Sequence, residues 1–312
     1  MRARFFAALT ELAEENPSVL LLTADLGYLV VDVFRDRFPD RFLNVGVAEQ
    51  NMVGVATGLA EAGYVPFIYS ITPFVVLRPY EFIRNGPVQH GLPVRIVGIG
   101  GGFEYGNDGL SHYGLEDVAV LRALPGIDIV TPADGGQVRA ALLATWDRPG
   151  PVYYRLGKDD TAAVPGLGGR FEAGRVQIVR EGEDILLVVM GSIAAEAVRA
   201  AERLATESIA ATVAVVSCIR PAPVEDLTEL LSRFGTVLTI EAHYENGGLG
   251  SLVAEVAAEH GSGCRVTRCA VRELPGGVSG SREFLYRRHG LDAESLCETA
   301  LRCLQGRPRG TA

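Results

Sequence analysis

The stretch NVGVAEQNMVGVATGLAEAGYVPF, residues 44–67, predicts a helix that leads into a short strand. Beyond Gly46 its residues are mostly small and apolar, and Gly54 and Gly58 favour close packing against a neighbouring element. Glu49 stands in the first turn of this helix, where the helix dipole favours an exposed carboxylate by about 0.3–1 kcal/mol. The apolar neighbours predict a buried carboxylate instead. Buried carboxyl groups are often catalytic, and Glu49 is therefore a candidate for chemistry that shares a proton.

On both sides of this helix, strand-like runs alternate with helical ones, which is typical of parallel sheets covered by helices. The strand-like runs lie at residues 18–27, 64–70, 93–102, 127–134 and 150–157. Residues 159–182 are rich in glycine, show little periodicity and are expected to form a linker. A second alternation fills residues 183–312. The sequence thus predicts two α/β domains, 1–158 and 183–312, each with three layers built on a parallel sheet.

Composition excludes several classes of function. The 312 residues carry a formal net charge of −9, which argues against a nucleic-acid surface and against binding to anionic membranes. No apolar run reaches the roughly 20 residues that span a bilayer, and the N-terminus lacks the pattern of a signal peptide. The five cysteines form no CxxC pair, so reduced core thiols in the cytoplasm are expected.

A second candidate site is the loop GGFEYGNDGLSHYG, residues 101–114. It leaves the carboxyl end of a predicted strand, where open parallel sheets bind ligands. It carries Glu104, Asp108 and His112, although a purely structural loop is the alternative. The segment GGLGSLV, residues 247–253, only partly matches a dinucleotide fingerprint, because Val253 replaces its third glycine. Tight helix packing is the favoured role there, and anion binding at the helix N-terminus is the alternative.

The order of several segments carries a resemblance. TADLG, FLNVGVAEQNMVGVATGLAEAGYVPF, GNDGLSH, ALPGIDIVTPAD, GPVYYRLG and GGLGSLVAEV follow one another as in the C-terminal half of transketolases. The chain most resembles the small subunit of split, two-gene transketolases, over essentially its whole length. The resemblance implies an enzyme dependent on thiamine diphosphate that transfers a two-carbon ketol unit from a ketose donor to an aldehyde acceptor. Residues 1–158 would form the pyrimidine-binding domain, and residues 183–312 the transketolase C-terminal domain.

The resemblance also implies residues that contact the cofactor. Glu49 matches the glutamate that hydrogen-bonds N1′ of the aminopyrimidine and stabilises its imino tautomer. Phe74 falls where the family stacks an aromatic ring on the pyrimidine, and a core phenylalanine is the alternative. Asp25 matches an acidic residue near the thiazolium and the substrate.

Other matched positions concern the substrate. Asp108 and His112 match residues that contact donor and acceptor hydroxyl groups, and His112 is also a catalytic candidate. Arg155 matches an arginine that binds the substrate phosphate, and Arg2 is a further match to such a residue.

Two departures from the family pattern concern the same phosphate. Gly100 stands where the family usually has a histidine, and Leu29 stands where it usually has a serine. Each charged hydrogen bond that is lost would cost about 1–3 kcal/mol of binding. We therefore expect a substrate other than an ordinary pentose phosphate.

The chain also lacks the family's GDG motif and the paired asparagines that bind the diphosphate and Mg²⁺. We therefore expect no metal ligand in this chain, with Mg²⁺ bound mainly by a separate N-terminal transketolase subunit. An α₂β₂ heterotetramer is the simplest assembly of two such chains.

Three other interpretations stay open. The beta subunit of a 2-oxoacid dehydrogenase shares the domain order and the glutamate, although GNDGLSH and VGVAEQNMVGVA are closer to transketolase. The second is a scaffold subunit without catalytic activity, but the presence of Glu49, Asp108 and His112 speaks against it. The third is an oxidoreductase that binds a nucleotide through GGLGSLV.

Overall fold

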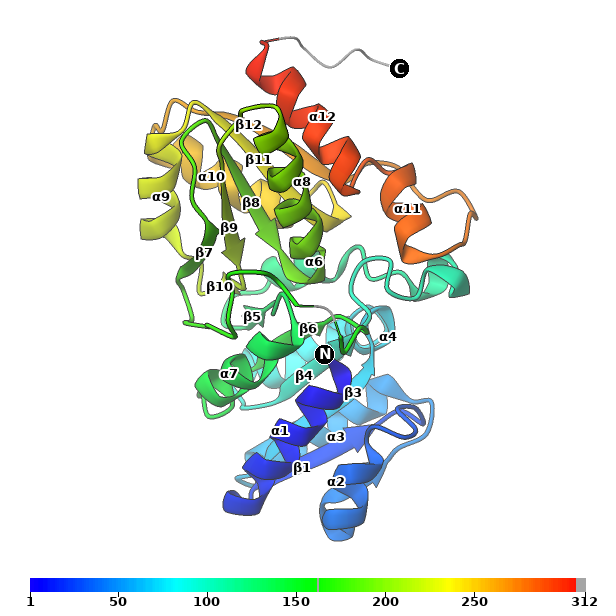
Figure 1. Cartoon of the computed structure of the whole chain (residues 1–312). Coiled ribbons are helices and arrows are strands. Elements are labelled where there is room, and N and C mark those ends of the chain that lie inside the picture. Colours follow the sequence, from blue (N-terminus) through cyan, green and yellow to red (C-terminus); the bar gives the residue numbers. More distant parts are fainter. Residues whose placement is uncertain (162, 307–312) are drawn as a thin grey trace.

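The computed structural model describes residues 1–161 and 163–306 (Figure 1). Its strands are β1 (Val19–Thr23), β2 (Phe42–Asn44), β3 (Val65–Ile71), β4 (Arg95–Ile99), β5 (Asp128–Val130), β6 (Val152–Leu156), β7 (Val176–Arg180), β8 (Ile185–Met190), β9 (Ala211–Val216), β10 (Cys218–Arg220), β11 (Thr236–Tyr244) and β12 (Arg265–Val271). Its α-helices are α1 (Arg2–Glu15), α2 (Asp32–Arg37), α3 (Glu49–Glu61), α4 (Thr72–Val76), α5 (Tyr80–Ile83), α6 (Asp117–Arg122), α7 (Gly135–Thr145), α8 (Ala194–Thr206), α9 (Val224–Arg233), α10 (Leu249–Glu259), α11 (Arg282–Arg288) and α12 (Ala293–Leu304).

The first sheet has seven strands in the order β10-β5-β6-β4-β3-β1-β2. All neighbours are parallel except β10, which pairs antiparallel with β5. Helices α1, α2 and α7 pack on one face, and α3, α4 and α6 pack on the other. Strands covered on both faces need apolar side chains on both sides, and β1 (VLLLT) is buried at every position.

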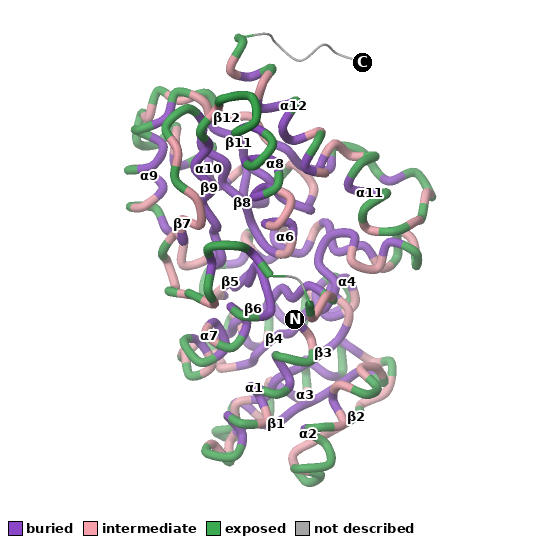
Figure 2. The backbone as a smooth tube through the Cα atoms, viewed as in Figure 1, coloured by how far each residue is buried: buried purple, intermediate pink, exposed green. Residues whose placement is uncertain are grey.

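The second sheet has five strands in the order β12-β11-β8-β9-β7. Helices α8 and α12 cover one face, whereas α9 and α10 cover the other. Strands β8 (ILLVVM) and β9 (ATVAVV) are continuous apolar runs and are buried along their whole length (Figure 2). The structure thus confirms the predicted fold class of two three-layer α/β domains built on parallel sheets.

The segment that was expected to be a linker contributes to the second sheet. Strand β7 lies within it and pairs antiparallel with β9. Only one of its five residues is fully buried, so the strand has no clear alternation of buried and exposed positions by which the sequence could have predicted it. A short strand further along the chain, β10, returns to the first sheet. Each sheet is therefore mostly parallel with one antiparallel edge strand.

One apolar core joins the two domains. It includes residues of α3 and β1 in the first domain and of β8 and α10 in the second. The buried face of α3 presents Met52, Val53, Ala56 and Ala60 to this core. Burial of a methionine or valine side chain stabilises the fold by about 1.5–3 kcal/mol. Packing of α3 therefore holds its first residue, Glu49, in place.

None of the five cysteines, all within the described residues, forms a disulfide, and four of them are buried. In the described part of the chain, no helix combines the length and the apolar character that crossing a membrane requires.

Candidate active site

The carboxyl group of Glu49 lies at the head of α3 and is almost completely buried, with 3 % of the residue exposed. The helix begins there because Gly46, at φ +71°, turns the chain sharply after β2. The hydroxyl of Ser70, near the end of β3, donates a hydrogen bond to Glu49 Oε1 at 3.3 Å. The structure therefore places a carboxylate at the carboxyl ends of parallel strands, where α/β folds bind ligands.

Arg78 is the charged partner of this carboxylate. Its Nη1 donates to Glu49 Oε1 at 3.1 Å and to Oε2 at 3.0 Å. Its guanidinium also lies over the ring of Phe74, with 3.9 Å between Cζ and the ring centroid. Sequence reasoning missed Arg78 and Ser70. The spacing of four residues between Phe74 and Arg78 was the available signal, because residues four apart lie on one face where a helix or its last turn continues.

His112 reaches the same ring from another side. Its imidazole meets Phe74 edge-on, with ring centroids 5.0 Å apart and an angle of 69° between the planes. The side chains of Ser111 and His112 are hydrogen-bonded at 3.0 Å. The structure thus brings together Glu49, Phe74 and His112, which the sequence had placed on three separate segments.

Asp108 lies in the same loop and is exposed, at the end of a 3₁₀ turn that begins at the buried Gly106. Burial, and then the charge of Asp108, raises the pKa of the Tyr113 hydroxyl. The single O–H of Tyr113 is shared between the carbonyl oxygens of Gly106 and Val278, each 2.9 Å from the hydroxyl oxygen, and so ties this loop to the second domain.

Asp25 lies in the loop after β1 and is exposed. Its carboxylate accepts hydrogen bonds from Asn44 Nδ2 at 2.9 Å and from the Tyr28 hydroxyl at 3.2 Å. Asn44 Oδ1 accepts the backbone N–H groups of Asp25 and Gly46, each at 3.0 Å. Asn44 therefore fixes Asp25 to the turn that leads into Glu49.

Arg155 has a different environment from these residues. It lies on β6 between the domains and is only 4 % exposed. Its Nε donates to Asp117 Oδ2 at 2.8 Å, and its Nη2 donates to the carbonyls of Gly114 and Ala242 at 2.7 and 2.9 Å. This geometry favours a structural role at the domain junction. The substrate role that the resemblance implies for Arg155 stays a prediction.

The position of Gly100 is filled by a neighbouring side chain. A Cβ at Gly100 would overlap the ring of Tyr105. Burial raises the pKa of the Tyr105 hydroxyl, and the nearby charge of Arg2 opposes that rise. Lys158 Nζ lies 4.4 Å from the centroid of the Tyr105 ring. Tyr105, with two cationic residues near it, therefore occupies the space where the family usually has a histidine. Leu29, the other departure, is 90 % exposed.

The backbone of segment 247–253 is hydrogen-bonded to Glu241, a residue of the preceding strand β11. Glu241 accepts the backbone N–H groups of Leu249 and Gly250, both at 2.8 Å, at the start of α10. A Cβ at Gly248 would overlap this carboxylate. The amides that a nucleotide phosphate would need are thus occupied, which favours the packing interpretation of this segment. Burial raises the pKa of Glu241 to about 7 and lowers that of the neighbouring His243 to about 4.

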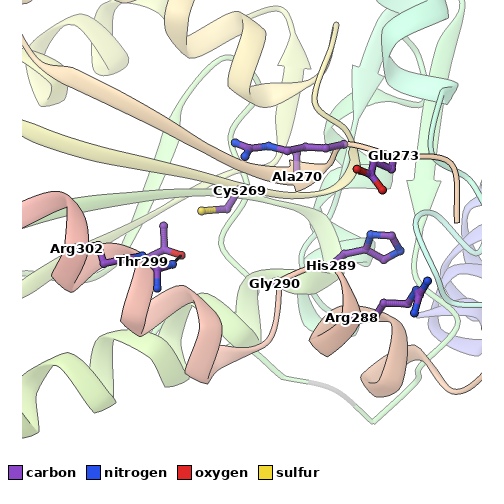
Figure 3. A pocket seen from close by; sticks show the side chains of 9 residues that line it. Cys269, Ala270, Glu273, Arg288, His289, Gly290, Thr299 and Arg302 are labelled. Atoms are coloured by element: carbon purple, nitrogen blue, oxygen red, sulfur yellow. Dashed lines mark hydrogen bonds between the residues drawn. The ribbon is translucent and has the colours of Figure 1, made fainter. Parts of the chain in front are cut away.

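A pocket of about 520 Å³ lies apart from these residues, in the second domain between β12, α11 and α12 (Figure 3). It is lined by Cys269, Ala270, Arg272, Glu273, Arg288, His289, Gly290, Thr299 and Arg302. None of the residues predicted to contact cofactor or substrate lines it. Within residues 1–161 and 163–306, no group of three His, Cys, Asp or Glu side chains could hold a metal ion.

Comparison with known proteins identifies the family. Residues 1–163 match the model of the transketolase pyrimidine-binding domain, and residues 174–296 match that of the transketolase C-terminal domain. The chain belongs to the transketolase family. As the resemblance predicted, it is a transketolase-type transferase subunit, and the family implies thiamine diphosphate as the cofactor.

Among the relatives of this transketolase-family chain are subunits of split enzymes. An apulose-4-phosphate transketolase subunit of Actinobacillus succinogenes is 35 % identical, over 86 % of each chain. A 6-deoxy-6-sulfo-D-fructose transketolase subunit of a Clostridium species is 34 % identical, over 96 % of this chain and 93 % of the relative. A solved structure described as a split-gene transketolase, an inactive beta4 tetramer, is 35 % identical with a TM-score of 0.88, over 98 % of this chain and 99 % of the other.

Proposed function

We propose that this chain supplies the pyrimidine-binding half of a split transketolase active site. A separate N-terminal subunit would supply the diphosphate-binding half together with Mg²⁺, in an α₂β₂ assembly. The enzyme would transfer a two-carbon ketol unit from a ketose donor to an aldehyde acceptor. The observation that carries this proposal is that the buried Glu49 carboxylate and the ring of Phe74 lie near enough to each other for one guanidinium, that of Arg78, to contact both.

The residues present fit one half of the cofactor. An aminopyrimidine needs a carboxyl group at its ring nitrogen and an aromatic face for stacking, and Glu49 and Phe74 provide this pair. A diphosphate with Mg²⁺ needs oxygen ligands around the metal. The described residues offer no group of three His, Cys, Asp or Glu side chains that could hold the metal ion, which supports assigning that half to a partner.

Each side chain of the site has a distinct task in this proposal. When bound, thiamine diphosphate supplies the reactive carbon that carries the ketol unit. Glu49 holds the proton at the ring nitrogen of the pyrimidine, and its burial keeps water from competing for that proton. His112, beside Phe74, and Asp108, in the same loop as His112, meet the hydroxyl groups of donor and acceptor.

The substrate is proposed to differ from an ordinary pentose phosphate. In place of a histidine at position 100, the surface is formed by Tyr105 with Arg2 and Lys158 near it. The two cationic side chains could bind an anionic group of the substrate. The names of two relatives, with apulose 4-phosphate and 6-deoxy-6-sulfo-D-fructose, support a varied choice of donor among related subunits. We also propose a cytoplasmic location, which the mostly buried cysteines, without a disulfide among the described residues, support.

Co-expression of this chain with a diphosphate-domain subunit from the same host tests the proposal. The purified complex is assayed for bound thiamine diphosphate with Mg²⁺ present, and for ketol transfer from a panel of ketoses. Glu49→Gln should keep the partner but lower kcat by about 10²–10⁴-fold. Glu61→Gln, an exposed change at the other end of α3, is the matched control and should leave activity unchanged.

Two results would reject this function. Full activity of the Glu49→Gln complex would favour the scaffold interpretation. Release of CO₂ from a 2-oxo acid, without ketol transfer, would favour the 2-oxoacid dehydrogenase interpretation.

A further inference from the structure

Arg78 makes both of the contacts that the proposed function assigns to the aminopyrimidine. Its Nη1 hydrogen-bonds to the two carboxylate oxygens of Glu49 at 3.1 and 3.0 Å. Its guanidinium covers a face of the Phe74 ring at 3.9 Å, while His112 approaches the same ring edge-on. The carboxylate and the aromatic ring are therefore engaged by one side chain of the same chain.

A guanidinium is well suited to imitate the ring. It is planar, it donates N–H groups in a fixed geometry, and it stacks on aromatic faces. A ring with a nitrogen that shares a proton with a carboxylate, and a face that stacks on phenylalanine, presents the same chemistry. Both groups cannot hold the same carboxylate oxygens and the same ring face together.

We propose that Arg78 is a self-occupying latch: it holds Glu49 and Phe74 in the free subunit and must swing away before the aminopyrimidine enters. This inference rests on the proposed function, because it assumes that Glu49 and Phe74 bind that ring. It assigns to Arg78 a role in setting cofactor affinity.

The burial of Glu49 explains why the latch closes. Glu49 is only 3 % exposed, and apart from Arg78 its side chain accepts a hydrogen bond only from Ser70 among the described residues. A buried carboxylate without a charged partner is costly. Arg78 supplies the missing charge until the ring takes its place.

The position of Arg78 explains how the latch opens. It lies in the turn between α4 and α5, outside both helices, and its side chain is 45 % exposed. Its guanidinium has no other hydrogen-bond or ion-pair partner within residues 1–161 and 163–306. Rotation into solvent therefore breaks no polar contact other than those with Glu49, together with the stacking on Phe74.

Titration with the pyrimidine half of the cofactor tests the latch without a partner subunit. The probe is 4-amino-5-hydroxymethyl-2-methylpyrimidine, added to the full chain and followed by calorimetry. Arg78→Met keeps the apolar stem and removes the guanidinium, so it should bind the probe about tenfold more tightly than the wild type. Arg78→Lys keeps the charge without the planar group and should give an intermediate affinity.

Arg84→Met is the matched control, because Arg84 is exposed and its guanidinium donates to the side chain of its neighbour Asn85 rather than to the site. It should leave the affinity unchanged. Titration of the assembled complex with thiamine diphosphate and Mg²⁺ should rank the variants in the same order. Circular dichroism checks that each variant is folded. If Arg78→Met does not fold, the comparison of Arg78→Lys with the wild type still tests the latch.

The outcomes separate the latch from the proposed function. If the wild type binds the probe and Arg78→Met binds it equally or more weakly, Arg78 does not compete and the latch is rejected. If Glu49→Gln binds the probe as well as the wild type, or if no variant binds it, the proposed pyrimidine site itself is rejected.

Discussion

Replacement of Arg155 by methionine separates a structural role from a role in substrate binding. Arg155 and Asp117 are 4 % and 1 % exposed, and their side chains meet at 2.8 Å. Without Arg155, the Asp117 carboxylate would keep only the hydroxyl of Tyr153, at 2.7 Å, since its Oδ1 has no hydrogen-bond partner among the described residues. Removing one partner of a buried ion pair costs about 3–5 kcal/mol.

This loss of stability would also lower the melting temperature. For domains of this size, each kcal/mol shifts the melting temperature by about 2–4 °C, so Arg155→Met should melt on the order of 10 °C below the wild type. The assay is thermal unfolding followed by circular dichroism, repeated in urea. Arg139→Met is the control, because Arg139 and its partner Glu11 are 59 % and 62 % exposed. Such surface pairs contribute at most about 1 kcal/mol.

A second variant tests the origin of the loss. Asp117→Asn, added to Arg155→Met, removes the unpaired charge and should therefore cost much less than it does in the wild type. The structural interpretation is refuted if Arg155→Met has the melting temperature of the wild type, while the enzyme assembled with this variant shows a raised KM at unchanged kcat. That result would establish Arg155 as the substrate residue that the resemblance implies.

Two other perturbations concern buried groups near the site. Between about pH 5 and 6.5, the folded chain holds one proton more than the unfolded chain at Glu241, whose pKa is about 7, and one fewer at His243, whose pKa is about 4. Their opposite slopes of about 1.4 kcal/mol per pH unit cancel, so the unfolding free energy of Glu241→Gln, but not of the wild type, should rise with pH across this window. Urea unfolding midpoints of the wild type and of Glu241→Gln, each at about pH 5 and about pH 6.5, measure this. The same change with pH in both proteins would contradict the prediction. Gly100→His should destabilise the chain by about 1–3 kcal/mol, because Gly100 has φ +84° and a Cβ there overlaps Tyr105. Adding Tyr105→Ala should recover part of the melting temperature, and no recovery would show that backbone strain alone is responsible.

Local patterns along the chain were sufficient to predict the fold class, the family and the candidates on α3 and in the loop 101–114. Apolar runs alternate with amphipathic ones, and the motifs keep a specific order. Glu49 could be singled out because a charged residue interrupts an apolar helix start, which is visible within a few residues.

Which charged groups meet is a property of the folded chain that no local pattern contains. Glu49 and Arg78 are 29 residues apart, Arg155 and Asp117 are 38 apart, and Arg155 reaches the carbonyl of Ala242 across 87 residues. No periodicity encodes such pairs, because they depend on how strands from distant segments are ordered within a sheet and on how two sheets pack. The same holds for β7 and β10, two short edge strands whose positions follow from the neighbours they pair with rather than from their own composition.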